Sequence, residues 1–221
     1  MSFAPRFKTL PAAQRALWPK LKEVPRQFVL YGGTALALRL GHRSSVDFDF
    51  FSTDPFAPAQ LRQALSFLAE AESLQVAPNT LTVSVPGSES VKISFFGGLR
   101  LGRVGEPEWS EDGVMQIASL LDVAACKMAV VQERAEAKDY LDVHAIMQSG
   151  VPLPDMLGAA QAVYGEQFNA MITLKALTYF EDGNLSALTE DVKKTLRAAV
   201  AAVKVIPLCA RVNDQLARPG D

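Results

Sequence analysis

The sequence predicts an α+β fold, in which a small mixed β-sheet with flanking helices is followed by a helical bundle. Short apolar runs with strand-like alternation are confined to the first half, whereas helical spacing of apolar residues runs almost unbroken from residue 119 onward. Between them, residues 100–113 are rich in Gly, Pro and Glu, which is typical of a linker or an edge segment. We therefore expect a core domain over 1–117 and a helical domain over 118–221.

The composition is that of an ordinary globular protein, with 49% hydrophobic and 21% charged residues among 221. The two cysteines, Cys126 and Cys209, lack metal-ligand spacing and are expected to be free, buried thiols. The net charge of -2 excludes a strong overall positive field, so a nucleic-acid partner would need a local basic patch. Because no apolar run is long enough to cross a bilayer or to act as a signal peptide, we expect a cytoplasmic protein without membrane association.

The expected elements follow from local periodicity and from the residues that interrupt it. In the first half, strands are expected at 28–31, 46–50, 80–85 and 91–96, and helices at 10–22, 34–40 and 58–71. Gly41 ends the helix over 34–40, and a Pro-Gly-Ser turn separates the last two strands. In the second half, helices are expected at 119–132, 137–148, 155–164, 168–177 and 186–204. The first two would form a hairpin, and the last ten residues are expected to be a frayed tail.

A glycine pair, Gly32-Gly33, lies where the strand at 28–31 meets the following helix. Two glycines let the backbone approach a ligand closely, and the N–H groups and partial positive charge of a helix N-terminus favour phosphate. Thr34 adds a hydroxyl at the same place. The turn is therefore a candidate phosphate-binding site formed by Gly32, Gly33 and Thr34.

Two aspartates, Asp47 and Asp49, alternate with apolar residues on the next expected strand. Residues i and i+2 of a strand point to the same side, so both carboxylates share one face. The bulky neighbours are expected in the core, namely Val46, Phe48, Phe50 and Phe51. Burying two carboxylates among apolar neighbours costs folding free energy unless a cation compensates their charge. Asp47 and Asp49 are therefore candidate ligands of magnesium, which would hold a nucleoside triphosphate beside the glycine turn.

The segment 32–51, GGTALALRLGHRSSVDFDFF, resembles the opening motif of the nucleotidyltransferase superfamily, in which Gly-Gly or Gly-Ser precedes Asp-x-Asp. Within that superfamily it is similar to the AbiEii/AbiGii toxin family. A second block is similar to that family's helical motif of Asp, Ala, Lys, Arg and a later Arg/Lys-Asp-x-x-Asp. It consists here of Asp122, Lys127, Arg134, Lys138, Asp139 and Asp142. The two blocks occur in the family's order, and the rest of the chain is matched only in being helical.

The resemblance implies that a nucleoside monophosphate is transferred from a nucleoside triphosphate to an acceptor hydroxyl, with magnesium and with release of pyrophosphate. It implies RNA, such as tRNA, or a protein side chain as the acceptor, and a cognate antitoxin in a toxin–antitoxin or phage-defence setting. It also implies catalytic positions for Asp47 and Asp49 and an active-site role for Lys127. Asp139 and Asp142 would support the site or take part in catalysis.

The spacing of the second block allows two interpretations. Lys127 and Arg134 are seven residues apart, which is two turns on one helix face, and Asp139 and Asp142 share a face of the next helix. A lysine placed there could offset the charge that develops in phosphoryl transfer. An ordinary salt-bridged helical hairpin is the alternative. Arg43, in the loop before the aspartate strand, would likewise contact a phosphate or form a structural salt bridge.

One departure from the superfamily pattern concerns a third carboxylate, which its transferases often carry on a later strand. In the strand at 91–96, Ser94 occupies that position. This favours a single metal ion, or nucleotide binding alone, unless Asp139 or Asp142 supplies the missing group. A catalytically inactive nucleotide-binding or interaction module is therefore the alternative function. A third option, an aminoglycoside-type antibiotic nucleotidyltransferase, predicts an acidic cleft, whereas an RNA acceptor predicts a local basic surface.

Overall fold

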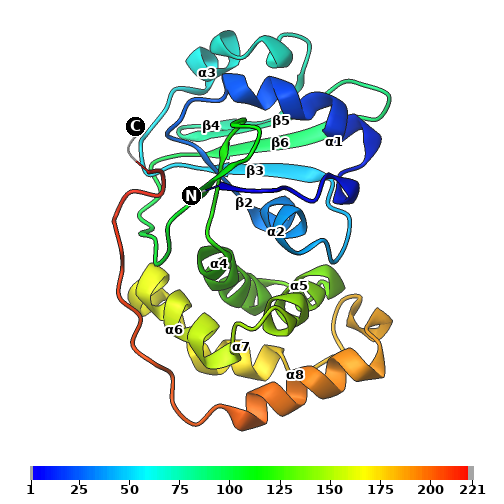
Figure 1. Cartoon of the computed structure of the whole chain (residues 1–221), viewed down its shortest axis with the longest axis vertical. Helices are drawn as coiled ribbons and strands as arrows, with labels where there is room; N and C mark the ends of the chain where they lie inside the picture. The colour runs from blue at the N-terminus through cyan, green and yellow to red at the C-terminus, as the bar shows by residue number, and fades with distance from the viewer. Residues whose placement is uncertain (1, 219–221) are drawn as a thin grey trace.

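A computed structural model describes residues 2–218 as a twisted sheet above a set of helices (Figure 1). The eight strands form one mixed sheet in the order β1-β7-β8-β2-β3-β6-β5-β4. Their bounds are β1 Ser2–Phe3, β2 Val29–Tyr31, β3 Asp47–Phe51, β4 Glu72–Ala77, β5 Thr80–Val85, β6 Val91–Phe96, β7 Glu108–Ser110 and β8 Gln116–Ile117. The predicted fold class, a mixed sheet with flanking and following helices, is confirmed.

Helices cover the sheet on both faces. On one face lie α1 (Ala12–Leu17), its 3-10 continuation η2 (Trp18–Glu23) and α3 (Pro58–Ala64). On the other face α2 (Gly32–Leu40) lies between the sheet and the helices of the second half (Figure 1). Gly41 ends α2 in the left-handed conformation with a φ of 70°, as expected of a C-cap. The expected helix over 58–71 is shorter, because the chain becomes extended at Leu65.

The second half is helical, as predicted, and the first pair forms a hairpin. The helices are α4 (Leu120–Glu133), α5 (Ala137–Gln148), α6 (Leu153–Tyr164), α7 (Ala170–Ala176) and α8 (Glu190–Ala202). Packing against α5, α6 and α7 makes α4 the central helix of the group. The hydroxyl of Ser119 accepts the backbone N–H of Asp122 and so caps its first turn. Among residues 2–218, no helix is both long and apolar enough to span a membrane.

The segment expected to be a linker, 100–113, contains a strand of the sheet. Within it, β7 pairs with β1 on one side and with β8 on the other. The strand β4 was also missed, because its six residues are all exposed and show no alternation of burial. Short or fully exposed strands have no periodic signal, so only their backbone pairing defines them. Whether 1–117 and 118–221 fold as separate domains stays a prediction.

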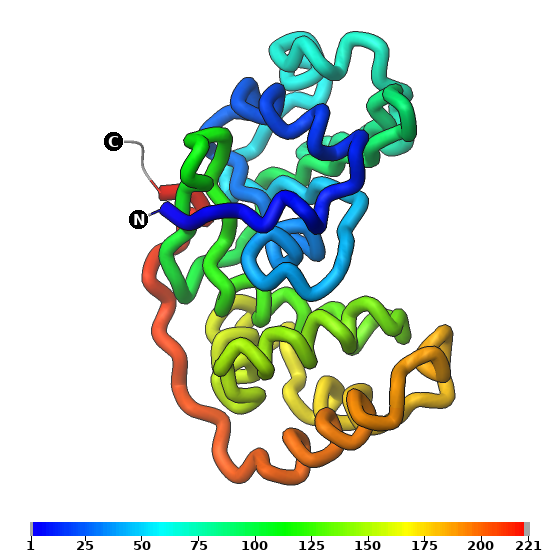
Figure 2. The backbone as a smooth tube through the Cα atoms, turned by 45° about the vertical axis from the view of Figure 1, so that its right-hand side comes forward, coloured from blue at the N-terminus to red at the C-terminus, as the bar shows by residue number. Residues whose placement is uncertain are grey.

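The C-terminal segment is bound to the sheet, so the expectation of a frayed tail is wrong for the described residues up to 218. The chain leaves α8 and runs back along the molecule to the sheet end, beside the N-terminus (Figure 2). There the backbone N–H of Arg103 donates to the carbonyl of Asn213 over 2.8 Å, and its guanidinium donates to the carbonyl of Gln215 over 2.6 Å. Leu216 is buried in the core. Residues 219–221 lie outside the described residues.

The strand β3 separates a buried aromatic face from a polar face. Phe48 and Phe50 are fully buried, and Phe50 stacks on Phe95 of β6 with ring centroids 5.0 Å apart. Phe51 is only partly buried. Val46, also expected in the core, is 54% exposed because it precedes the first residue of β3. The alternation of burial along β3 places both aspartates on the face opposite Phe48 and Phe50, as predicted.

Candidate active site

The glycine turn closes directly on the aspartate strand. Gly32 begins α2 with a φ of +71°, a conformation that favours glycine, and a Cβ there would lie 2.5 Å from Oδ2 of Asp49. A Cβ on Gly33 would lie 2.7 Å from Nη2 of Arg43. Gly32 therefore approaches a carboxylate, and Gly33 a guanidinium, so closely that a Cβ would fit only if the neighbouring side chain moved. The structure thus brings the glycine pair at the start of the segment 32–51 next to the aspartate strand at its end.

The hydroxyl of Thr34, expected to face a phosphate, instead holds the turn to β3. Thr34 is 1% exposed, and its hydroxyl donates to the main-chain carbonyl of Asp47. The same hydroxyl lies 2.9 Å from the hydroxyl of Ser45, which is also buried. Sequence reasoning did not single out Ser45, because nothing in its local pattern shows that the loop folds back over α2. A contact of Thr34 with a ligand would therefore use its backbone rather than its hydroxyl.

The two carboxylates of β3 lie together without a compensating ion pair. Asp47 and Asp49 are both partly buried. Burial raises the pKa of Asp49, and the charge of Asp47 raises it further, whereas the charges of Lys92 and Lys127 and a hydrogen bond with Ser94 lower it. The ion pairs between described residues do not include either aspartate. The pair therefore has the electrostatic character of a cation site.

The second motif forms a buried ionic network centred on Lys127. Its ammonium lies 2.7 Å from Oδ1 of Asp139 and 2.6 Å from Oδ2 of Asp142, and both carboxylates are fully buried. Arg43 donates to Asp142 from Nε over 2.6 Å and from Nη2 over 2.7 Å. Arg134 donates from Nε to Asp139 over 2.8 Å. This network joins the loop before β3 to the hairpin of α4 and α5.

The same contacts show how the charged residues of the second block are paired. Burial alone would raise the pKa of Asp142, but hydrogen bonds from His42 and Arg43 and the charge of Lys127 outweigh it and hold the pKa far below the ordinary value. Burial is likewise outweighed at Asp139, where Arg134 and Lys127 hold the pKa below the ordinary value. The hairpin is thus salt-bridged, and Arg43 forms an ion pair with Asp142. Roles of these residues towards a nucleotide stay predictions.

The ionic network is electrostatically coupled to the aspartate pair. The charge of Lys127 lowers the pKa of Asp49, and the charge of Asp49 contributes to raising that of Arg134 after the larger contribution of Asp139. Asp139 and Asp142 have carboxylates that are paired with Lys127, Arg134 and Arg43. Among residues 2–218, no group of three or more His, Cys, Asp or Glu side chains is arranged to hold a metal ion.

Comparison with known proteins identifies this arrangement. The model of the family described as nucleotidyl transferase AbiEii toxin, Type IV TA system, matches residues 21–205, which include the glycine turn, the aspartate strand and the ionic network. The chain belongs to this family. AbiEii proteins are nucleotidyltransferases, so the predicted family and the predicted enzyme class are both confirmed.

Other proteins agree with the AbiEii assignment. An uncharacterised protein of Aquifex aeolicus (strain VF5) is 33% identical over 158 residues, which cover 70% of this chain and 74% of that protein. The crystal structure of a nucleotidyltransferase from H. pylori has 18% identity and a TM-score of 0.54, covering 85% of this chain and 90% of that one. MenT4, a nucleotidyltransferase toxin of Mycobacterium tuberculosis H37Rv, has 15% identity and a TM-score of 0.59, covering 86% and 82%. At these identities the two structures show a shared fold.

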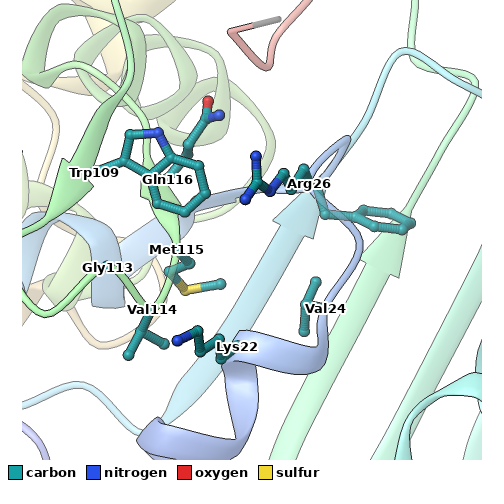
Figure 3. Close-up of a pocket in the computed structure, with 9 residues that line it drawn as sticks. Lys22, Val24, Arg26, Trp109, Gly113, Val114, Met115 and Gln116 are labelled. Carbon is teal, nitrogen blue, oxygen red and sulfur yellow. The ribbon is translucent and has the colours of Figure 1, made fainter. Parts of the chain in front are cut away.

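A separate pocket of about 310 Å³ lies away from this AbiEii site (Figure 3). It is lined by residues of η2, β7 and β8 and of the segment before β2, including Lys22, Arg26 and Trp109. The guanidinium of Arg26 lies 5.7 Å from the centroid of the Trp109 ring. None of the residues predicted for the active site lines it. The pocket is therefore not part of the glycine and aspartate site.

Gly32→Ala tests whether the turn needs its close approach to Asp49. We expect the free energy of unfolding to fall by more than the ~1–2 kcal/mol that a left-handed conformation costs a residue with a Cβ. The loss should be larger because the methyl group would also displace the Asp49 carboxylate. Gly113→Ala is the matched control, since Gly113 has a φ of +66° and no atom within 4 Å of the added Cβ. Thermal unfolding of both variants measures the difference. Equal losses would contradict a specific contact with Asp49.

Proposed function

We propose that this protein transfers a nucleoside monophosphate from a nucleoside triphosphate to an acceptor hydroxyl, as the toxin of a toxin–antitoxin or phage-defence pair. The observation that carries the proposal is the closure of a helix N-terminus, through Gly32, directly on the carboxylate of Asp49. This closure supports a single site in which the turn would bind phosphate and the aspartate pair would bind a cation. Membership of the AbiEii nucleotidyltransferase toxins supports the same reaction class.

The donor set fits a magnesium ion. Asp47 and Asp49 present hard carboxylate oxygens on one face, and the raised pKa of Asp49 reflects burial and an uncompensated like charge. A cation held by these two residues would relieve that repulsion. When bound there, magnesium would polarise the phosphates of the nucleotide and neutralise part of their charge. Two protein carboxylates leave the remaining coordination positions to phosphate oxygens and water.

The residues around the pair have distinct proposed roles. The backbone at Gly33 and Thr34 would bind phosphate at the start of α2. Lys127 would face the triphosphate from the helical side. Asp139 and Asp142 would position Lys127, because both are fully buried in ion pairs with it.

In the proposed reaction, the acceptor oxygen forms a bond to the α-phosphorus and the hydroxyl proton of the acceptor passes to solvent water. The bond from the α-phosphorus to the bridging oxygen breaks, and pyrophosphate leaves with the electron pair. Arg43, already bonded to Asp142, would hold the loop before β3 rather than contact the phosphate directly.

We propose RNA, such as tRNA, as the acceptor, with a protein side chain as the other candidate. Arg134 and Lys138 offer partly exposed positive charge beside the ionic network, with side chains 45% and 49% exposed. Such a local basic surface suits a polyanion in a chain whose net charge is -2. The type IV toxin–antitoxin assignment of the family supports a cognate antitoxin as partner.

The decisive experiment incubates the protein with each α-labelled nucleoside triphosphate, magnesium and total bacterial RNA. We expect label on RNA with the wild type and none with Asp47→Ala/Asp49→Ala, because the double variant lacks both proposed metal ligands. Glu70→Ala, which removes an exposed acid away from the site, should transfer label normally. If no label moves, total protein replaces RNA and pyrophosphate release is followed.

Triphosphate binding without pyrophosphate release would replace this proposal with the nucleotide-binding module. Ser94, which stands in β6 directly opposite Asp49, is the observation that favours that second candidate.

A further inference from the structure

The strand next to the aspartates carries a lysine in register with them. In the parallel pair of β3 and β6, Lys92 lies opposite Asp47 and Ser94 lies opposite Asp49. Residues in register on neighbouring strands point to the same side of a sheet, so Lys92 and Ser94 share the face of the carboxylates. The burial of β6 agrees, since Val91, Ile93 and Phe95 face the core while Lys92 is exposed.

Lys92 differs from the other cations around the site in having no ionic partner. Lys127, Arg43 and Arg134 are each bound to Asp139 or Asp142. Lys92 is exposed, and it forms no ion pair with a carboxylate of residues 2–218. Its charge nevertheless reaches the site, because it lowers the pKa of Asp49. An exposed ammonium without an ion pair, beside two carboxylates, is more accessible to a ligand than the ammonium of the 5%-exposed Lys127.

The surrounding sheet face offers no other positive charge. Across β3, β6, β5 and β4, Lys92 is the only basic residue. Its neighbour in register on β5 is Ser84, and that of Ser94 is Thr82. Ser94 is buried and bonded to Asp49, so β6 provides a hydroxyl and an ammonium where a third carboxylate would be needed for a second metal ion.

We propose that Lys92 binds a phosphate group at the aspartate pair and supplies there the positive charge that a second metal ion would otherwise provide. This inference rests on the proposed function and names a further residue of its site. The phosphate belongs either to the nucleoside triphosphate or to the backbone of an acceptor RNA. In both cases the ammonium offsets negative charge next to the α-phosphorus, where phosphoryl transfer concentrates it.

A structural role for Lys92 predicts a different result. If the ammonium only offsets the charge of Asp47 and Asp49, Lys92→Ala should change the pH dependence of stability and leave phosphate binding unchanged. If it binds phosphate, the variant should bind more weakly and Lys92→Arg should restore most of the affinity, because a guanidinium also binds phosphate. The pH dependence of stability and the affinity for phosphate can both be measured whatever the rate of nucleotidyl transfer.

The test compares wild type, Lys92→Ala, Lys92→Arg and Lys204→Ala, an exposed lysine beyond α8 that serves as control. Calorimetry measures the Kd for each nucleoside triphosphate with magnesium, and steady-state transfer gives the KM for RNA at several salt concentrations. A triphosphate contact should raise the nucleotide Kd of Lys92→Ala about tenfold or more. A contact with RNA should instead raise the KM and reduce the slope of its salt dependence by about one.

Three results would overturn the proposed role of Lys92. Lys92→Ala with unchanged nucleotide Kd, unchanged KM and unchanged salt slope overturns it, while wild-type binding and transfer leave the proposed function intact. A wild type that binds neither nucleotide nor RNA overturns the proposed function and the inference with it. Weaker binding by Lys204→Ala to the same extent would show a non-specific charge effect and would also overturn it.

Discussion

Asp49→Asn is expected to abolish nucleotidyl transfer while raising the thermal stability of the metal-free protein. The substitution removes a proposed metal ligand, so transfer should fall by about 10²–10³-fold or more. Stability should rise because burial, and then the charge of Asp47, raise the pKa of Asp49, which means that the folded chain disfavours its ionised form. Thermal unfolding at neutral pH without magnesium measures the gain, and label transfer measures the loss.

The pH dependence checks the sign of this effect. Because the folded-state pKa of Asp49 lies above the unfolded value, ionisation destabilises the folded chain as pH rises from the ordinary range through the raised pKa. The stability advantage of Asp49→Asn should therefore vanish below the ordinary pKa of about 3.9 and be complete above the raised one. Asp54→Asn, which changes an exposed acid just after β3, serves as control. Lost transfer without any gain in stability would contradict an uncompensated Asp49.

Lys127→Met is expected to cause the largest loss of stability of any substitution considered. Removing the ammonium leaves two fully buried carboxylates, Asp139 and Asp142, without their shared partner. Breaking a buried ion pair costs about 3–5 kcal/mol, and we expect the lower end because Arg134 and Arg43 remain bound to the acids. For a chain of this size, such a loss lowers the unfolding temperature by about 10 °C.

The control for Lys127→Met is Lys138→Met on the neighbouring helix. Lys138 has a 49%-exposed side chain and pairs with the exposed Glu136, so its removal should cost less than about 1 kcal/mol. Equal unfolding temperatures for the two variants would show that the buried network does not stabilise the hairpin. Transfer measured well below the unfolding temperature then tests the proposed catalytic contribution of Lys127 separately from folding.

The first motif was accessible from sequence because its geometry is local. The Gly32-Gly33 turn, the helix that follows it and the alternation around Asp47 and Asp49 depend on residues within a few positions of one another. The strands at 80–85 and 91–96 were predicted with the bounds that the structure has, since each run alternates and a turn separates them. Periodicity also gave the hairpin of α4 and α5. The sequence pattern therefore predicted those elements whose conformation depends on neighbouring residues in the chain.

The partners of the charged residues required the tertiary structure. Spacing placed Lys127, Asp139 and Asp142 on facing surfaces, but it left open whether the acids serve chemistry or structure. The ion pairs of these acids include Arg43, which is 99 residues from Asp142 in the chain. The burial of both acids likewise results from packing against segments distant in sequence.

The sequence by itself thus determined the family, the fold class and the carboxylate pair, because local geometry has a local signal in turns, alternation and helical period. Only the tertiary structure decided the strands β4 and β7, the bound C-terminal segment and the hydroxyl contacts of Thr34. It also decided that Lys92 stands in register with Asp47. Register, burial and ion pairing are properties of segments that meet after folding, so the order of residues in one segment does not specify them.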